Sequence, residues 1–332
     1  MARSGWKRFV KPAVKTGLAV LVLWYLYRHV TRTWHDLHEH GESIRVDPTW
    51  LAVGAGLYLA GLTACGVFYA KVMAASPGPV GPIVAVRAYL ISHLGKYVPG
   101  KAMVVVMRVA LTAPYGARPA TAALAAFYET LAMMAAGALA AAVGFALGPA
   151  PVQLIPLGAS AGLAVLLLGV VEPRVFPRVT KLMTMPFPNV GPDALPALSY
   201  RLLGAGLLLS LTGWVLLGLS QVAVVRAVAP AGLAPGLWPV VVAGVALATV
   251  AGFVVAVLPG GLGVREGVLM ATLAPAVGED TAVVSALALR LTWVAAEVVA
   301  GVALAAVRPA LPAAAPLSPP EPPAPSPESI RA

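Results

Sequence analysis

The sequence predicts an all-α protein that crosses a lipid bilayer several times. Of its 332 residues, 59% are hydrophobic and 11% are charged, and the mean hydropathy is +0.86. Several apolar runs approach or exceed the ~20 residues with which an α-helix crosses the hydrocarbon of a membrane. We therefore expect a polytopic integral membrane helix bundle over residues 16–307. A basic segment, 1–15, precedes it, and a proline-rich tail, 308–332, follows it and is expected to be disordered.

The net charge of +10 limits the classes of partner. The cations lie at the ends and breaks of apolar segments, and no DNA- or RNA-binding motif gathers them, so nucleic acid is not an expected partner. Anionic lipid headgroups explain the charge better. The single cysteine, Cys65, excludes an intrachain disulfide and a multi-cysteine metal site.

The first two spans are expected at 16–30 and 50–73. Basic residues precede the first span, so the positive-inside rule places the N-terminus in the cytoplasm. The aromatic end of this span, W-Y-L-Y-R-H-V, indicates an anchor that is not cleaved. The loop that follows contains W-H-D-L-H-E-H-G-E, which matches no defined metal spacing, so we interpret it as a polar interfacial loop and expect no metal site.

A broken segment follows the second span. Residues 83–98 and 102–113 are each too short to cross comfortably, and they flank Pro99 and Gly100. Proline lacks an N–H and disfavours helical angles in the residue before it, whereas glycine accepts positive φ, so two half-helices are expected in place of one span. We expect a re-entrant hairpin, which is tolerated at membrane depth only where protein or a water-filled cavity satisfies its polar groups.

Three cations, Lys96, Lys101 and Arg108, accompany this break. A cation at bilayer depth costs roughly 2.5 to 3.5 kcal/mol on insertion scales, so three in one segment imply a watery cavity, internal carboxylates or a bound anion. The free N–H groups and the positive dipole end of a half-helix that begins at Lys101 would suit a phosphate. The alternative is a cytoplasmic turn whose lysines extend to lipid headgroups.

Four further spans complete the expected bundle. The stretch 172–201 is the longest hydrophilic segment between spans and carries several basic residues, so it is expected in the cytoplasm. The remaining spans are expected at 118–147, 153–171, 202–228 and 281–307.

The second half of the chain repeats the broken segment. Apolar residues 237–258, the sequence L-P-G-G-L-G-V-R-E-G and residues 268–277 resemble the first break in order and spacing. Two halves, 16–148 and 152–307, then have three crossings each, and an odd number inverts the second half relative to the first. The two hairpins would therefore enter from opposite faces and meet near the midplane, as in inverted-repeat transporters. Both termini are expected on the cytoplasmic side of a plasma (inner) membrane.

Charged residues at the expected depth of the membrane define a candidate anion site. Five cations and three carboxylates are expected at that depth. The excess of positive charge would be offset by a phosphate-bearing ligand, or avoided if the lysines reach the lipid headgroups. For Glu129 and Glu297 the alternative is a role as buried partner of an arginine. The candidate lipid- or anion-binding residues are Lys96, Tyr97, Pro99, Gly100, Lys101, Arg108, Pro259, Gly260, Gly261, Gly263, Arg265, Glu266 and Arg290, and the candidate cavity carboxylates are Glu129 and Glu297.

Motifs of other functional classes do not match. The glycines at 260–267 lack the last glycine of G-x-G-x-x-G, since Glu266 stands there, and no Gly-Lys-Ser or Gly-Lys-Thr of a P-loop occurs. These glycines suit close approach of a headgroup or a tight helix break, or alternatively close helix packing. No metal-hydrolase or serine-hydrolase motif occurs either, so we expect no cofactor and no enzyme activity.

Two stretches, H-L-G-K-Y-V-P-G-K followed by Arg108 and P-G-G-L-G-V-R-E-G, resemble the signatures of the lysylphosphatidylglycerol synthase transmembrane, or flippase-like, family. The similarity covers residues 87–307. Members with synthase activity carry an additional soluble aminoacyl-transfer domain, which is not expected here, so lipid aminoacylation is not expected. An acidic-basic pair often follows the first motif in that family, whereas Glu129 is followed here by Thr130. The motif positions are Lys96, Pro99, Gly100, Arg108, Pro259, Gly260, Gly263, Arg265 and Glu266.

These patterns predict a protein that binds an anionic lipid or a lipid-linked glycan and assists its movement between leaflets. No ATP site is evident, so movement would be passive or coupled to an ion or proton gradient. Two alternatives remain open at this stage. One is an integral-membrane transferase that acts on a lipid carrier, and the other is a non-catalytic accessory subunit of a partner membrane enzyme.

Overall fold

The computed structural model describes residues 24, 28, 31, 46–97, 102–148, 154–184, 194–229, 232–254, 264–307 and 309–310, and the regular structure in these residues is entirely helical. The α-helices are α2 (Pro48–Ala74), α3 (Pro82–Ser92), α4 (Ala102–Thr112), α5 (Pro119–Ala146), α6 (Leu154–Val171), α7 (Phe176–Thr184), α8 (Tyr200–Val228), α9 (Trp238–Val254), α10 (Val264–Val277) and α11 (Glu279–Ala306). Three short 3₁₀ turns join them, namely η1 (His93–Tyr97), η2 (Ala113–Tyr115) and η4 (Pro235–Leu237).

Six of the described segments are long and apolar enough to cross a membrane: α2, α5, α6, α8, α11 and the segment Pro235–Val254 that contains α9. The chain is therefore a multi-pass, all-α membrane protein, as the sequence predicts. The expected span at 16–30 lies almost wholly outside the described residues. The sixth candidate span is instead Pro235–Val254, which consists of η4 and α9. The sequence analysis placed these residues in the second broken segment and did not count them as a span.

The helices begin and end at residues whose local chemistry explains the boundary. Asp47 caps α2, since its Oδ1 accepts from the Thr49 N–H at 2.8 Å, and Pro48 supplies the preset φ of the first turn. Ser199 caps α8 in the same way, with its Oγ accepting from the Leu202 N–H at 3.1 Å. After α2 the chain turns through Gly78, whose φ of +73° is a left-handed conformation that glycine adopts without strain.

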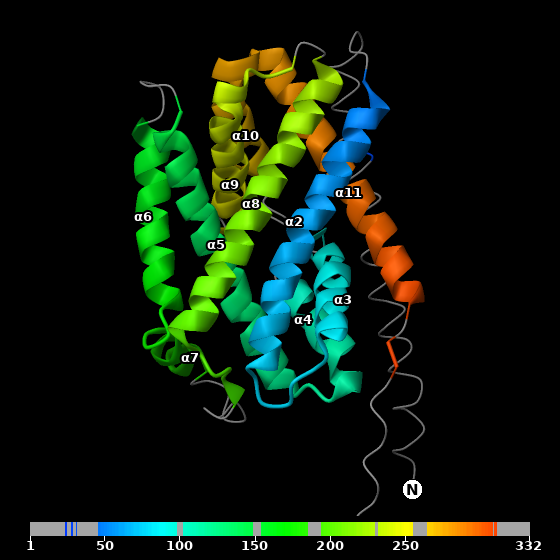
Figure 1. Cartoon of the computed structure of the whole chain (residues 1–332), viewed down its shortest axis with the longest axis vertical. Helices are drawn as coiled ribbons and strands as arrows, with labels where there is room; N and C mark the ends of the chain where they lie inside the picture. Colours follow the sequence, from blue (N-terminus) through cyan, green and yellow to red (C-terminus); the bar gives the residue numbers. More distant parts are fainter. Residues whose placement is uncertain are drawn as a thin grey trace, which may run out of the picture.

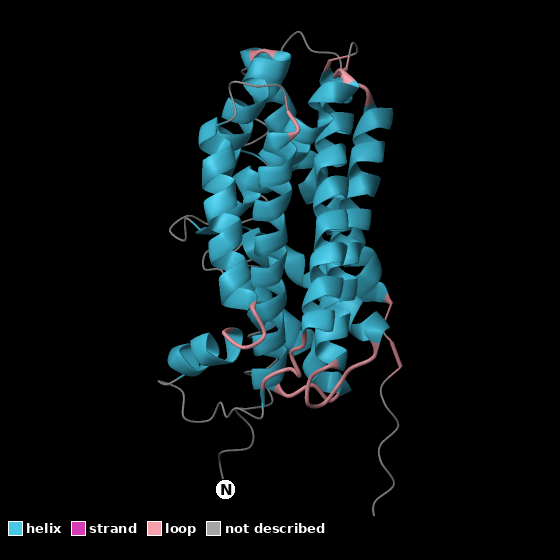
Figure 2. Cartoon of the chain, turned by 60° about the vertical axis from the view of Figure 1, so that its left-hand side comes forward, coloured by secondary structure: helices cyan, strands magenta, loops and turns pink. Residues whose placement is uncertain are grey.

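The long helices run side by side and alternate in direction, as Figures 1 and 2 show. In Figure 1, α2 descends, α5 rises, α6 descends, α8 rises and α11 descends, and the short α7 lies at the lower end. Helices α3 and α4 pack together with η1 between them and form what we call hairpin 1; α9 and α10 pack together as hairpin 2. Hairpin 1 occupies the lower part of the bundle and hairpin 2 the upper part (Figure 1). This is the opposed arrangement expected from two inverted halves.

The residues that join each pair of half-helices are the predicted breaks. Positions 98–101 and 255–263 lie outside the described residues, and with them the expected Pro-Gly and Pro-Gly-Gly turns. The half-helices on both sides of each break are described. In each hairpin the second half-helix runs back toward the end of the bundle at which the first half-helix begins (Figure 1).

Small residues allow the helices to approach closely where α2 crosses α8. A Cβ built on Gly61 would lie 2.9 Å from the Gly213 carbonyl oxygen, and one built on Gly213 would lie 2.7 Å from the Cys65 sulfur. Further along the same pair, the ring of Phe68 fills the space beside Gly206. Such contacts replace the hydrophobic driving force that helices lack inside lipid, and they make α2 and α8 the central pair of the bundle.

The two ends of the bundle differ in charge. The end where α2 ends and α5 and α8 begin carries Lys71, Arg118, Arg174, Arg178, Lys181 and Arg201, with Glu172 among them. The opposite end, where α2 and α11 begin, carries Asp47, Glu279, Asp280 and Arg226 among its described residues. We call these the basic end and the acidic end. Hairpin 1 enters from the basic end, and hairpin 2 enters from the acidic end (Figure 1).

Candidate functional site

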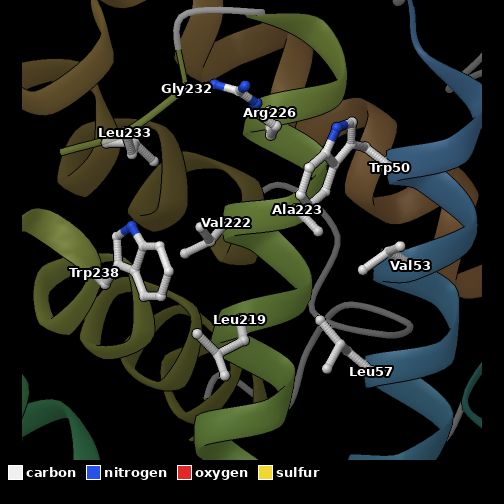
Figure 3. Close-up of a pocket in the computed structure, with 10 residues that line it drawn as sticks. All are labelled: Trp50, Val53, Leu57, Leu219, Val222, Ala223, Arg226, Gly232, Leu233 and Trp238. Carbon is white, nitrogen blue, oxygen red and sulfur yellow. The ribbon is translucent and has the colours of Figure 1, made fainter. Parts of the chain in front are cut away.

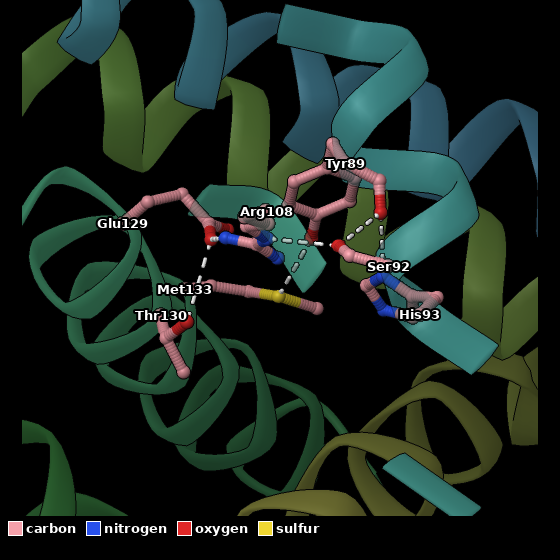
Figure 4. Close-up of polar contacts among 7 residues, drawn as sticks. All are labelled: Tyr89, Ser92, His93, Arg108, Glu129, Thr130 and Met133. Carbon is pink, nitrogen blue, oxygen red and sulfur yellow. Dashed lines mark hydrogen bonds and ion pairs between the residues drawn. The ribbon is translucent and has the colours of Figure 1, made fainter. Parts of the chain in front are cut away.

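Two clusters of charged side chains lie inside the bundle. The first, which we call the arginine cage, is centred on Arg108 of α4 (Figure 4). Its Nη1 donates to Glu129 Oε2 of α5 at 2.6 Å, and its Nε donates to Ser92 Oγ of α3 at 3.1 Å. Arg108 is 2% exposed and Glu129 is 0% exposed, so water reaches neither group.

Aromatic rings complete the arginine cage. The guanidinium carbon of Arg108 lies 4.2 Å from the ring centroid of Tyr89 and 4.9 Å from that of Tyr69, a geometry that stabilises a desolvated cation through the π-faces. On the carboxylate side, Thr130 Oγ1 donates to Glu129 Oε2 at 3.4 Å. Glu129 is thus the buried counter-ion of Arg108, and the cage fastens hairpin 1 to α2 and α5.

The second cluster, which we call the α11 cluster, gathers charges from both hairpins. Lys96 in η1 forms an ion pair with Glu297 of α11, and the Tyr58 hydroxyl of α2 donates to the same Oε1 atom of Glu297. Lys96 Nζ also lies 3.1 Å from the Tyr58 hydroxyl oxygen. The Glu297 side chain is 1% exposed, whereas the Lys96 side chain is 26% exposed. The lysine is therefore accessible while its carboxylate partner is covered.

Hairpin 2 contributes the other half of the α11 cluster. The first described turn of α10 brings the Arg265 guanidinium to 4.4 Å from the Trp293 ring centroid, and Glu266 pairs with Arg290 Nη1 at 3.0 Å. Tyr58 and Trp293 stack with ring centroids 4.2 Å apart at an interplanar angle of 15°. The stacked rings therefore contact both groups: Tyr58 contacts the Lys96–Glu297 pair, and Trp293 contacts Arg265.

A polar relay holds the stacked rings in position. Trp293 Nε1 donates to Ser220 Oγ of α8 at 3.0 Å, and Ser220 Oγ donates to the Gly54 carbonyl of α2 at 2.7 Å. The Trp293 indole and the Ser220 hydroxyl are both buried, so without these hydrogen bonds each would be an unsatisfied polar group. The hydrogen bond from Nε1 therefore fixes the orientation of the Trp293 indole. It also determines which face of the ring Arg265 contacts.

The described charges leave an excess of positive charge in the α11 cluster. Each of the three buried or half-buried carboxylates is paired with one cation: Glu129 with Arg108, Glu297 with Lys96, and Glu266 with Arg290. Among the described residues, no carboxylate lies within 4.0 Å of Arg265, which contacts the face of an indole instead. A cation over an indole at this depth still favours an anion, since cation–π attraction does not neutralise its charge.

The structure separates the predicted site residues into three groups. Lys96, Tyr97, Arg265, Glu266, Arg290 and Glu297 lie in or beside the α11 cluster. Arg108 and Glu129 lie in the arginine cage. Pro99, Gly100, Lys101, Pro259, Gly260, Gly261 and Gly263 lie outside the described residues.

Several residues of the two clusters were not among those predicted from the sequence. Tyr58, Trp293 and Ser220 of the α11 cluster, and Tyr89 and Ser92 of the arginine cage, stand in apolar helices where aromatic and small polar residues are ordinary core residues. The spacing of Trp293 from Arg290 and Glu297 on one helix was an available signal, since residues three and four apart share a helix face. Within the described residues, no group of three or more His, Cys, Asp or Glu side chains could hold a metal ion.

Comparison with protein-family models places this architecture among known proteins. The model described as Lysylphosphatidylglycerol synthase TM region matches residues 13–301. The match contains both hairpins, the arginine cage and the α11 cluster. A comparison with curated proteins finds no match.

The arginine cage predicts a strong dependence of stability on Glu129. Replacing it by glutamine leaves the Arg108 charge buried without a counter-ion, and we expect a loss of ~3 to 5 kcal/mol in unfolding free energy. The double variant Arg108→Met with Glu129→Leu removes both charges and should lose less than Glu129→Gln alone. Unfolding of the detergent-solubilised protein measures this, with Glu279→Gln, an exposed glutamate of α11, as control. A double variant less stable than Glu129→Gln would contradict the role of this pair.

Proposed function

The chain belongs to the family of the lysylphosphatidylglycerol synthase TM region, and from that membership we propose that it binds an anionic membrane lipid, or a lipid-linked glycan, and assists its movement between leaflets. Membership of the family links the chain to lipid handling. The choice of an anionic ligand, and the site at which it binds, come from the charges of the α11 cluster.

The observation that carries the proposal is the excess positive charge at Arg265. A guanidinium presents a planar fork that binds two oxygens of one phosphate, and Arg265 has no carboxylate within 4.0 Å among the described residues. The exposed part of Lys96 supplies a second cation, beside Tyr58 of the stacked pair. In this proposal a phosphate contacts Arg265 and is attracted by Lys96, and its charge offsets positive charge that otherwise makes the site costly inside a membrane.

The opposed hairpins supply a route to each face of the membrane. Hairpin 1 brings Lys96 from the basic end, and hairpin 2 brings Arg265 from the acidic end (Figure 1). Both contact α11, the first through Glu297 and the second through Trp293 and Arg290. In this proposal α11 is the common support, and movement of one hairpin at a time away from α11 opens the site to one leaflet while the other hairpin keeps it closed.

We place the basic end in the cytoplasm. Six lysines and arginines gather at that end within short connections, and Arg226 is the described cation at the acidic end; this asymmetry is the one that sets the orientation of membrane proteins. In a plasma membrane, α11 then ends on the cytoplasmic side, and the span expected at 16–30 would return the N-terminus to that side. Hairpin 1 enters from inside and hairpin 2 from outside.

Labelling of single cysteines tests this orientation. Cys65 is first replaced by alanine, and one cysteine is then introduced at Gly236, which is exposed at the acidic end, or at Ala113, which is exposed at the basic end. We expect an impermeant maleimide to label the Gly236 position on intact cells and the Ala113 position only after permeabilisation. The reverse pattern would place the basic end outside.

The anion site predicts that Arg265→Gln weakens binding of anionic lipid. The expected loss is ~1.5 to 3 kcal/mol of binding free energy, the usual contribution of a hydrogen bond to a charged group, and movement of a fluorescent anionic lipid in proteoliposomes should fall with it. Stability of the lipid-free protein should stay unchanged or rise, because the variant removes a cation that has no carboxylate partner.

The matched control is Arg201→Gln, which removes the same charge from the basic end of α8. Affinity for a zwitterionic phospholipid of the same chain length should fall less in Arg265→Gln, because its headgroup ammonium offsets the phosphate charge, and should not change in Arg201→Gln. If Arg265→Gln and Arg201→Gln have the same affinity for anionic lipid, the α11 cluster is not the binding site.

A further inference from the structure

A pocket separate from both charged clusters opens between α2, α8 and α9 at the acidic end (Figure 3). Its volume is about 420 Å³, within the usual range for sites that hold a small organic ligand. The side chains drawn in Figure 3 divide it into a polar rim and an apolar floor. The rim has Arg226 and Trp50, Trp238 lies lower at the level of Val222, and the floor has Leu57, Leu219 and Val222.

The rim presents one cation beside one indole, and a second indole lies lower in the pocket. Arg226 lies in the last turn of α8, and its guanidinium carbon is 5.9 Å from the Trp50 ring centroid. Trp50 and Trp238 are 39% and 40% exposed. Indoles at this position are typical of the membrane–water interface, where the ring contacts both lipid chains and headgroups. The rim therefore lies at the depth of the headgroups.

The chain around Arg226 holds its guanidinium at the rim. Gly232 has a φ of +68°, and this turn brings the backbone so close that a Cβ there would lie 2.8 Å from Arg226 Nη1. Among the described residues, no carboxylate lies within 4.0 Å of Arg226, even though Asp47, Glu279 and Asp280 lie at the same end. The positive-inside rule favours cations at the other end of the bundle, so it does not account for Arg226. Because Arg226 has no carboxylate partner among the described residues, its guanidinium can bind an anionic ligand.

The floor of the pocket lies beside the α11 cluster without opening into it. Leu57 and Leu219 immediately precede Tyr58 and Ser220, so the floor and the stacked rings are at the same level of α2 and α8. Successive residues of a helix point about 100° apart, so the leucines face α9 while Tyr58 and Ser220 face α11. The pocket is a second site, on a neighbouring face of the central helix pair, and none of its lining residues belongs to the α11 cluster.

We propose that this pocket binds one anionic phospholipid of the leaflet at the acidic end. The headgroup phosphate contacts Arg226, the glycerol region lies between Trp50 and Trp238, and an acyl chain lies against Leu57, Leu219 and Val222. A cation at headgroup depth, one indole beside it with a second lower, and aliphatic side chains below match the three parts of such a lipid in order. The inference does not depend on the function proposed for the α11 cluster.

Titration with phosphatidylglycerol and with phosphatidylcholine, followed by native mass spectrometry of the full chain, tests this site. All variants carry Arg265→Gln as background, so that binding at the α11 cluster does not mask the result. We expect Arg226→Gln to weaken binding of phosphatidylglycerol about tenfold, which is about 1.4 kcal/mol, and to weaken binding of phosphatidylcholine less, because its choline ammonium offsets the charge of the phosphate. Arg201→Gln, at the other end of α8, is the control and should change neither.

A second variant tests the apolar part of the pocket. Val222→Trp fills the floor and should weaken binding of both lipids, whereas Val215→Trp, on an exposed position of the same helix, should weaken neither. If Arg226→Gln matches Arg201→Gln, or if Val222→Trp matches Val215→Trp, the pocket is not a lipid site. Because the background already lacks Arg265, these results are independent of whether the α11 cluster binds lipid.

Discussion

The cost of holding charge inside a membrane is the constraint on which this structure depends. Three ion pairs place Glu129, Glu297 and Glu266 each against one cation. The paired Arg108 also lies over aromatic rings, and Arg265, which has no carboxylate within 4.0 Å among the described residues, lies over Trp293. Hairpin 1 depends on these contacts most, since its half-helices α3 and α4, of 11 residues each, are too short to cross a bilayer. Where pairing is complete, at Arg108, the cluster is closed to water. Where it is incomplete, at Arg265, the charge remains for a ligand.

In the function proposed above, the arginine cage has a structural role and the α11 cluster has the binding role. The arginine cage joins α3 and α4 of hairpin 1 to α2 and α5, and its members are almost fully buried. The α11 cluster joins both hairpins to α11 and keeps Lys96 partly exposed. The movement that we propose for hairpin 1 would break the Lys96–Glu297 pair and keep the buried Arg108–Glu129 pair. This division of roles follows from burial and pairing, and the family membership of the chain is consistent with it.

The helices and the two hairpins could be predicted from the sequence, whereas the pairing of the charges could not. Hydropathy, Pro48, Pro119 and the proline-glycine breaks determine local boundaries, so α2, α5, α6, α8 and α11 begin and end within a few residues of the expected positions. Which carboxylate meets which cation depends on how distant helices pack: Glu297 pairs with Lys96 and Glu129 with Arg108, over 201 and 21 residues of sequence. Tyr58 and Trp293 could not be singled out, because an aromatic residue in an apolar helix is typical of any core.

The measurement that tests the central claim most directly is the affinity of Glu297→Gln for an anionic lipid. Glu297 competes with a phosphate for Lys96, so its neutralisation should strengthen binding of the anionic lipid, by up to about tenfold for a contribution of ~0.5 to 1.5 kcal/mol. The control Glu279→Gln, at the exposed start of the same helix, should have little effect. If Glu297→Gln weakens anionic-lipid binding or leaves it unchanged, the charge balance of the α11 cluster does not govern lipid binding.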